Sequence, residues 1–323
     1  MAGEIINRLN VGQVVNVKLT DSAVTNGQNL VDAYNYAKTL TPNGAALSTS
    51  NRVSVIIQPG NYTLAATLTV NTEFVDLIGL GAQKLERGAI PAVIIDGNSL
   101  NVTANDVRVQ GISVGSQSFT IGASLPLQRF EDCTSGNNSF GYFTIVSGTF
   151  TNCSSGGNSF GFGAAASGTF TNCSSSGSGF GSLGAASGTF TNCTSGSDSF
   201  GASSGAASGT FTNCSSGGNS FGYGTVASGT FINCTSGANS FGYASTASGT
   251  FTNCTSGNNS FAVGGTASGT FTNCTGGLDS FGKYVTASGK FYQCRLTSGT
   301  FQAVSGAGLM RNCIDGNNNI VNQ

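Results

Sequence analysis

A cysteine returns at an almost constant interval from residue 133 to the end of the 323-residue chain. The interval is 20 residues, with one slip to 21 and one to 19. Nine phenylalanines stand three positions before these cysteines and nine stand seven positions after them, which accounts for 18 of the 22 phenylalanines. The cysteines are Cys133, Cys153, Cys173, Cys193, Cys214, Cys234, Cys254, Cys274, Cys294 and Cys313. Such a chain must stack identical units, because one unit alone is too short to bury its apolar side chains.

Short strand-like pieces broken by glycine, serine and asparagine make up each repeat, with no helix-forming run. A period of this length predicts an all-β fold, a β-solenoid with about 20 residues per coil. In "GTFTNC" the two-residue alternation of a strand sends phenylalanine to one side and both threonines to the other. We expect phenylalanine to point inward, and coils about 4.8 Å apart to align identical residues into ladders.

The residue before each cysteine is nearly always asparagine. An asparagine suits a tight turn, and its amide can bond the equivalent amide of the next coil. Asp132 and Gln293 occupy this position near the two ends of the series. A disulfide framework is typical of smaller secreted domains, and metal sites need clustered cysteines, so we interpret the thiols as a buried, unpaired ladder.

The N-terminal part differs from the repeats. Residues 25–40 place apolar side chains on one helical face, which predicts a short amphipathic helix that covers the open end of the β-helix. These side chains belong to Leu30, Ala33, Tyr34, Ala37 and Leu40. The pattern divides the chain into an N-terminal segment with this helix (1–50), irregular early coils (51–129) and the regular repeat (130–323).

The order of a helix, "VIIQPGNYTL", "VDLIGLG", "VIIDG" and "VRVQGISV", followed by "FTNC" coils, resembles the pectate-lyase-like right-handed parallel β-helix superfamily. The resemblance runs from about residue 25 to the end. It rests on structural positions, namely Pro59, Gly60, Gly79, Gly81 and the asparagine and cysteine ladders. The superfamily includes polysaccharide lyases and hydrolases, phage tailspikes and adhesins, and this chain looks most like a non-catalytic, tailspike-like or adhesin-like member.

Charge is scarce, since Asp, Glu, Lys and Arg make up 8% of the residues and the net charge is −1. This balance argues against nucleic acid as a partner. Neither a signal-peptide pattern nor a run long enough to cross a membrane occurs in the sequence, so we expect no membrane insertion. The features predict cytoplasmic synthesis with reduced cysteines and a place on a virion or another extracellular surface, as a monomer or as a homo-oligomer that is trimeric or joined end to end.

Acidic residues that could serve catalysis are few. The resemblance implies that an active member would use clustered carboxylates, with calcium in the lyases. The candidates in the early coils are Asp76, Asp96, Asp106 and Arg108, each of which we interpret as a turn or surface residue. Glu131 and Asp132 beside Arg129 are interpreted as a local ion pair rather than a cation site. We therefore predict a non-enzymatic protein without a cofactor, with a polysaccharide lyase or hydrolase as the enzymatic alternative.

The outward threonines form the main candidate binding surface. They give two rows with a spacing of about 6.6 Å along the strand and 4.8 Å between coils. They are Thr149, Thr151, Thr169, Thr171, Thr189, Thr191, Thr210, Thr212, Thr230, Thr250, Thr252, Thr270 and Thr272. The rows resemble the Thr-x-Thr arrays of β-solenoid antifreeze proteins, which suggests ice binding. The alternative is that threonine simply favours exposed strand positions and was copied with the repeat.

A second surface candidate is the position nine residues after each cysteine. Aromatic residues there could stack on sugars or could partly fill the core. The residues in this position are Tyr142, Phe162, Ser182, Ala202, Tyr223, Tyr243, Val263 and Lys283. The sequence thus favours a structural or adhesive β-helix, and its expected partner is a polysaccharide, a cell surface or ice.

Overall fold

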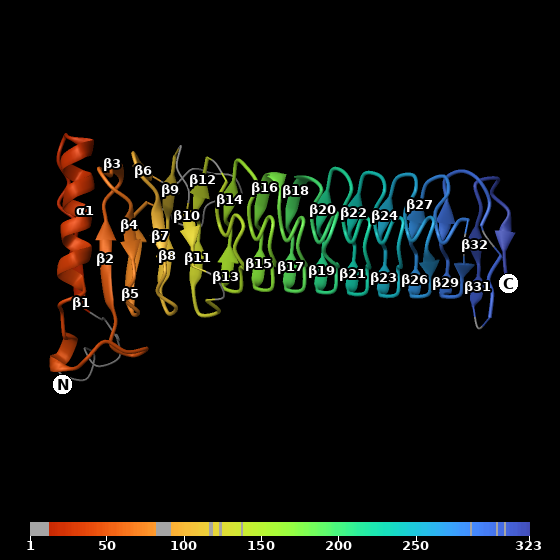
Figure 1. The fold of residues 1–323 in the computed structure, drawn as a ribbon, viewed down its shortest axis with the longest axis horizontal. Coiled ribbons are helices and arrows are strands. Elements are labelled where there is room, and N and C mark those ends of the chain that lie inside the picture. The colour runs from red at the N-terminus through yellow and green to blue at the C-terminus, as the bar shows by residue number, and fades with distance from the viewer. Residues whose placement is uncertain are drawn as a thin grey trace, which may run out of the picture. The chain divides into compact units, whose positions relative to one another are not determined.

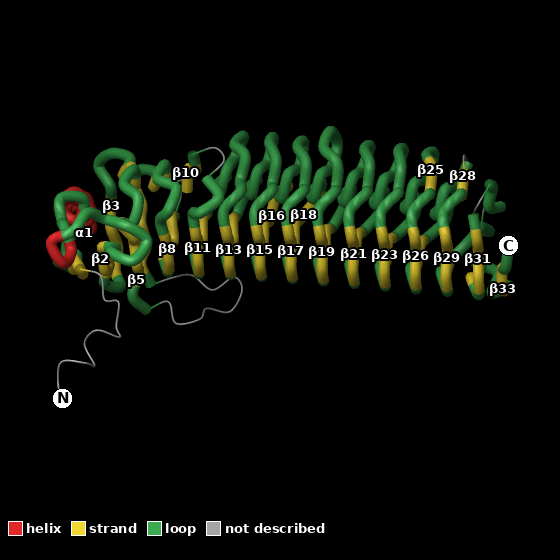
Figure 2. Tube along the Cα trace, turned by 90° about the horizontal axis from the view of Figure 1, so that it is seen from below, coloured by secondary structure: helices red, strands yellow, loops and turns green. Residues whose placement is uncertain are grey.

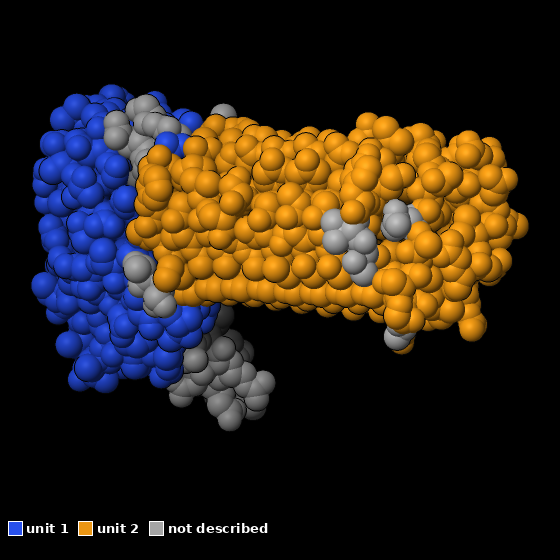
Figure 3. All heavy atoms as spheres, turned by 45° about the vertical axis from the view of Figure 1, so that its right-hand side comes forward, with its two compact units in different colours: residues 1–139, 148–155 blue, residues 140–147, 156–323 orange. Residues whose placement is uncertain are grey.

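The computed structural model describes residues 13–81, 92–115, 119–122, 125–136, 138–284, 286–301, 303–306 and 308–323. The chain divides into two compact units, one of residues 1–139 and 148–155 and the other of residues 140–147 and 156–323 (Figure 3). Each consists mainly of short parallel strands, with about 20 residues per turn in the repeats. The predicted parallel β-solenoid with an N-terminal helix is confirmed. The expectation that the N-terminus lacks a signal peptide concerns residues 1–13, of which 1–12 lie outside the described residues.

The first unit contains the early coils. One sheet joins β1 (Gln13–Asn16), β2 (Val53–Ile57), β5 (Val75–Gly79), β8 (Arg108–Gln110), β11 (Arg129–Glu131) and β13 (Thr149–Thr151). A second joins β3 (Gly60–Thr63), β6 (Val93–Asp96), β9 (Ile112–Val114), β12 (Thr134–Ser135) and β14 (Ser154–Ser155). A third joins β4 (Leu68–Val70), β7 (Leu100–Val102) and β10 (Phe119–Ile121). Alternate side chains of β2 are buried, so aliphatic residues form this part of the core.

Helix α1 (Ala23–Ala37) packs on β2 and β3 and covers the first coil of its unit (Figure 1). The predicted apolar face is correct at Leu30, Tyr34 and Ala37, which are fully buried. The helix begins earlier than predicted, because the Ser22 side chain accepts a hydrogen bond from the Thr25 N–H and caps the first turn. It also ends earlier than predicted, at Ala37. A short 3-10 turn, η2 (Pro42–Gly44), follows.

The second unit carries the regular repeat. Its first sheet joins β15 (Thr169–Thr171), β17 (Thr189–Thr191), β19 (Thr210–Thr212), β21 (Thr230–Ile232), β23 (Thr250–Thr252), β26 (Thr270–Thr272), β29 (Lys290–Tyr292) and β31 (Leu309–Arg311). Its second joins β16 (Ser174–Ser178), β18 (Thr194–Ser197), β20 (Ser215–Ser216), β22 (Thr235–Ser236), β24 (Thr255–Ser256), β27 (Thr275–Gly276), β30 (Arg295–Leu296), β32 (Cys313–Ile314) and β33 (Ile320–Val321). A small pair is β25 (Thr266–Ala267) with β28 (Thr286–Ala287). Figure 2 shows the strands of the first sheet following one another at regular intervals.

Two phenylalanine ladders fill the interior of the second unit. Rings in successive coils are stacked in parallel, as Phe211 and Phe231 are with centroids 4.8 Å apart. Rings of one ladder meet rings of the other edge to face, as Phe231 meets Phe241 at 5.7 Å. Both geometries are favourable for aromatic pairs. The predicted inward orientation is confirmed, since the ladder rings from Phe160 to Phe291 are fully buried.

Cysteine and asparagine form the other two ladders. All ten cysteines are buried and none forms a disulfide, as interpreted from the sequence. The Cys214 thiol donates to the carbonyls of Phe190 and Thr212, and burial raises its pKa above the ordinary value. The asparagine side chains are hydrogen-bonded from coil to coil at 3.0–3.1 Å, as where Asn213 Nδ2 donates to Asn192 Oδ1. In the first unit Asp132 accepts the corresponding bond from Asn152 at 2.9 Å.

The second phenylalanine of each repeat turns a corner of the coil rather than continuing a strand. Its φ lies between +49° and +61° from Phe140 to Phe281, a region that L-residues other than asparagine and aspartate rarely adopt. The next residue, usually glycine, also has a positive φ, as Gly222 does at 79°. Because ring stacking on both sides holds the phenylalanine in place, the core stabilises a strained corner in every coil.

The 21-residue repeat leaves the strand register unchanged. Thr189 of β17 still pairs with Thr210 of β19, and Ala186 still bridges Ala207. The extra residue is Ser204, which is exposed at the corner and donates from its hydroxyl to the Leu183 carbonyl of the preceding coil. The insertion is therefore absorbed in one loop.

Candidate binding surfaces

The threonine rows lie on the outer side of the first sheet, as predicted. The first threonine of each pair is exposed from Thr149 to Thr250 and half-buried at Thr270, whereas the second is half-buried. In the second unit each residue is paired in register with its equivalent in the next coil. Thr149 and Thr151 belong to the first unit, where they pair with Arg129 and Glu131. The rows thus present hydroxyl and methyl groups at regular intervals without charge.

Serines form an additional exposed column that the sequence interpretation missed. Each stands two residues before the first threonine of its coil. The exposed members in the second unit are Ser167, Ser187, Ser208, Ser228, Ser248 and Ser268. The serine is constant in the repeated letters "SGTFTNC". Its exposure could not be predicted, because the two-residue alternation of the strand does not extend past the glycine to the serine.

The position nine residues after the cysteine is partly core and partly surface. Ser182, Ala202 and Val263 are buried, in line with core filling. Tyr142 is 40% exposed. The aromatic members lie ring on ring between coils, with Tyr142 on Phe162 at 5.4 Å and Tyr223 on Tyr243 at 5.3 Å. Tyr142 is exposed and the other three are half-buried, so all four are partly outside the core.

Two of the predicted acidic candidates are buried in an ion-pair network, which corrects their interpretation as turn or surface residues. Arg52 donates to both oxygens of Asp76 and, at 2.8 Å, to Asp106. Asp76 is 6% and Asp106 5% exposed. The hydrogen bonds to Asp76 raise the pKa of Arg52 above its ordinary value, so the guanidinium stays charged. Sequence reasoning missed Arg52, since 54 residues separate it from Asp106.

The remaining charged candidates Glu131, Arg108 and Asp96 lie on strands of the early coils. Glu131 pairs with Arg108 of the preceding coil and not with the nearby Arg129. The strand register places Arg108 beside Arg129 and Gln110 beside Glu131, so this ion pair runs diagonally between the two coils. Asp96 is half-buried on β6, where its carboxylate lies against the backbone of Gly115. Among the described residues, no three His, Cys, Asp or Glu side chains are grouped so that they could hold a metal ion.

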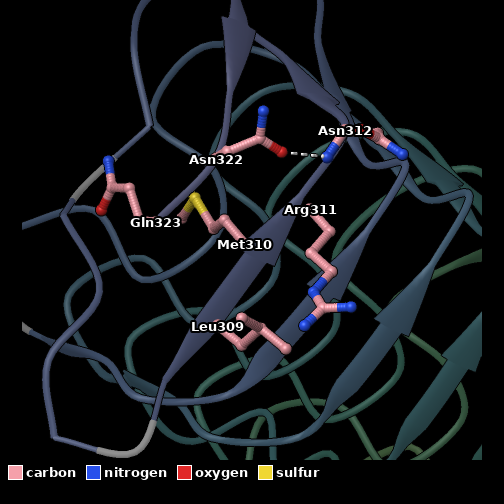
Figure 4. Close-up of a pocket in the computed structure, with 6 residues that line it drawn as sticks. All are labelled: Leu309, Met310, Arg311, Asn312, Asn322 and Gln323. Atoms are coloured by element: carbon pink, nitrogen blue, oxygen red, sulfur yellow. Dashed lines mark hydrogen bonds between the residues drawn. The ribbon is translucent and has the colours of Figure 1, made fainter.

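A shallow pocket of about 430 Å³ lies beside β31, the last strand of the first sheet of the second unit (Figure 4). Its walls come from Leu309, Met310, Arg311, Asn312, Asn322 and Gln323. The Met310 N–H donates to the Gln323 carbonyl at 2.8 Å, and the Asn312 N–H donates to the Asn322 side chain at 2.8 Å. Residues 322 and 323 thus occupy hydrogen-bonding groups on the outer edge of β31. Arg311 is the one charged residue in the pocket wall.

Comparisons with known proteins leave the family open. No protein-family model matches the chain, and no curated protein matches it. Among solved structures, the ORF18 protein of Geobacillus virus E2 is similar with a TM-score of 0.37 and 14% sequence identity. The similarity covers 97% of this chain and 61% of that chain, so this chain spans about three fifths of that protein's length. Membership of the pectate-lyase-like superfamily stays a prediction.

None of the helices in the described part of the chain is long and apolar enough to cross a membrane.

Proposed function

We propose that this chain is a non-enzymatic structural or adhesive β-solenoid, a component of a phage, viral or cell surface. The observation that carries the proposal is the constant coil of the second unit. The same buried phenylalanine and cysteine and the same outward-facing threonine recur in register from β15 to β26. Coils that repeat the same strand pairing form a regular stack, and such a stack can hold the groups on its surface at a fixed spacing.

The charged residues also support a non-enzymatic function. Glycoside hydrolysis requires two carboxyl groups that are free to exchange protons, and general acid and base catalysis requires reach to the substrate. Asp76 and Asp106 share the guanidinium of Arg52, and Glu131 is bonded to Arg108. These carboxylates are therefore held in ion pairs that stabilise the early coils.

We expect the protein to leave acidic polysaccharides intact. The purified chain would be incubated with polygalacturonate and alginate, with and without calcium, while new reducing ends and unsaturated products are measured. The expected result is a rate equal to that of the buffer. Cleavage that disappears in an Asp76→Asn variant, whose fold is checked by circular dichroism, would establish the lyase or hydrolase alternative instead.

Ice binding is a second candidate, favoured by the exposed threonine rows in register. Thr230 and Thr235 give a matched pair, since both are exposed threonines of the same coil but lie on different sheets, in β21 and β22. If the rows bind ice, Thr230→Lys should remove most of the thermal hysteresis, because a long charged side chain interrupts the regular surface, and Thr235→Lys should retain it. If the wild-type protein shows neither thermal hysteresis nor ice shaping, ice binding is ruled out.

A further inference from the structure

Two consecutive corner positions form a line of side chains along the second unit, which we name the corner strip. The positions are nine and ten residues after each cysteine. The strip consists of Tyr142–Phe143, Phe162–Gly163, Ser182–Leu183, Ala202–Ser203, Tyr223–Gly224, Tyr243–Ala244, Val263–Gly264 and Lys283–Tyr284. The threonine rows account for none of these residues.

The second position of the strip holds large apolar side chains in a strained backbone. Phe143, Leu183 and Tyr284 have φ values of 56°, 61° and 76°. This left-handed conformation costs an L-residue about 1–2 kcal/mol, and glycine occupies the same position in other coils, as at Gly163 and Gly224. Burial does not offset the cost, since the three side chains are 60%, 45% and 67% exposed. Strain at residues that stay largely exposed points to a function outside the fold.

Phe143 is the best-supported of these residues. Its ring meets Tyr142 at 4.5 Å and Phe162 at 5.6 Å, in both cases edge to face at 70° and 73°. Tyr142 and Phe162 are themselves stacked, with an angle of 4° between their planes. A β-carbon at Gly163 would lie 2.2 Å from the Phe143 ring, so only glycine in the next coil leaves room for it. The ring is fixed in position while more than half of its residue surface faces solvent.

A second aromatic group recurs farther along the strip. Tyr223 and Tyr243 are stacked with an angle of 1° between planes and are half-buried. The coils between Phe162 and Tyr223 carry the small buried side chains of Ser182 and Ala202. With about 4.8 Å per coil, three coil steps separate the two aromatic groups by roughly 14–15 Å. Two coils without an aromatic side chain in the strip thus separate the two aromatic groups.

We propose that the corner strip binds an uncharged polysaccharide, whose sugar rings lie against Phe143 and the tyrosines. Tyrosine and phenylalanine offer an apolar ring surface, and the tyrosine hydroxyl adds a polar contact, which is the combination that suits a sugar. This inference rests on the adhesive form of the proposed function and names its ligand.

Charge and extent distinguish this ligand from others. Between Cys133 and Asp279 the only charged residue is Asp198, so the coils that carry Phe143 and the stacked tyrosines contain no cation to hold a phosphate or a carboxylate. The one cation of the strip, Lys283, lies in its last coil and pairs with Asp279 at 3.7 Å. A stable protein partner would cover about 800 Å² of continuous surface on this side. The two aromatic groups are instead separated by the coils of Ser182 and Ala202, whose side chains are small and buried. A chain of repeating sugar units can contact separate groups along one line.

Phe143→Gly tests the proposal without removing a core residue, because glycine is native at this position in neighbouring coils. Wild type and variant would be compared in pull-downs on insoluble cellulose, chitin and starch, and by affinity electrophoresis in β-glucan, mannan and polygalacturonate. We expect wild type to bind at least one neutral polysaccharide and the variant to bind it about 3–10-fold more weakly, which corresponds to one aromatic contact. Tyr223→Ser, copied from Ser182, should weaken binding similarly.

The control is Tyr36→Ser, which removes an exposed aromatic side chain from α1 in the other unit and should leave binding unchanged. Circular dichroism and thermal unfolding would show that each variant is folded. Retention on none of the neutral polysaccharides, retention unaffected by Phe143→Gly, or binding to polygalacturonate alone overturns the proposal. A structural function survives these outcomes, since that proposal fails only through the cleavage assay described above.

Discussion

Replacing Phe231 with alanine is expected to lower the free energy of unfolding by about 3–5 kcal/mol. Its ring is fully buried and is stacked at 4.8 Å on both Phe211 and Phe251. It also meets Phe221 and Phe241 edge to face at 5.8 and 5.7 Å. Truncation would leave a cavity that neighbouring coils cannot close, because their own rings are held from both sides by the ladder.

Urea unfolding monitored by circular dichroism would measure this loss. Phe301→Ala is the matched control, since Phe301 is 9% exposed and its ring is tilted by 34° against Phe281 at the end of the ladder. Its truncation should cost less than half as much. Equal losses at the two positions would contradict the ladder as a cooperative core. Repeat proteins can unfold in steps, so the transition midpoint and slope should both be compared.

Arg52→Met is expected to destabilise the early coils by roughly 3–5 kcal/mol, the usual cost of removing one partner from a buried ion pair. The substitution leaves Asp76 and Asp106 close together, nearly buried and without their shared cation. It also removes the contact of the guanidinium with the Phe74 ring, whose centroid is 5.5 Å away. The measurement is the shift of the first unfolding transition in urea.

Arg108→Met supplies the comparison. Its ion pair with Glu131 is much more exposed, with side-chain exposures of 39% and 30%, so its loss should cost about 0–1 kcal/mol. Changing Asp76 and Asp106 to asparagine in the Arg52→Met background should recover much of the lost stability. If Arg52→Met is no more harmful than Arg108→Met, the network does not hold the early coils together.

The sequence predicted the interior of the repeats because their period aligns identical residues. Once Phe231 is placed inward, Phe211 and Phe251 must follow, and the register confirms them. The asparagine ladder could be predicted for the same reason, since Asn213 has equivalents in neighbouring coils.

The positions that escaped prediction depend on contacts between segments far apart in the chain, or on a local backbone that the letters do not show. Arg52 lies 54 residues from Asp106, and no periodicity links them. β1 pairs with β2 although α1 lies between them in the sequence. Nothing in the letters of Gln13–Asn16 therefore indicated that they join a sheet. The candidate site at the corner was ambiguous because its residues differ from coil to coil, and the letters do not show that Phe143 is exposed while Phe140, also with a positive φ, is buried.

The corner at Ser204 has a consequence for how such a protein can diversify. Because a residue was added there without disturbing the pairing of β17 with β19, the length of this loop is independent of the spacing of the strands. Longer segments could therefore be carried at this corner, coil by coil, while the core stays constant. Natural selection or protein engineering could then change what the molecule displays without rebuilding what holds it together.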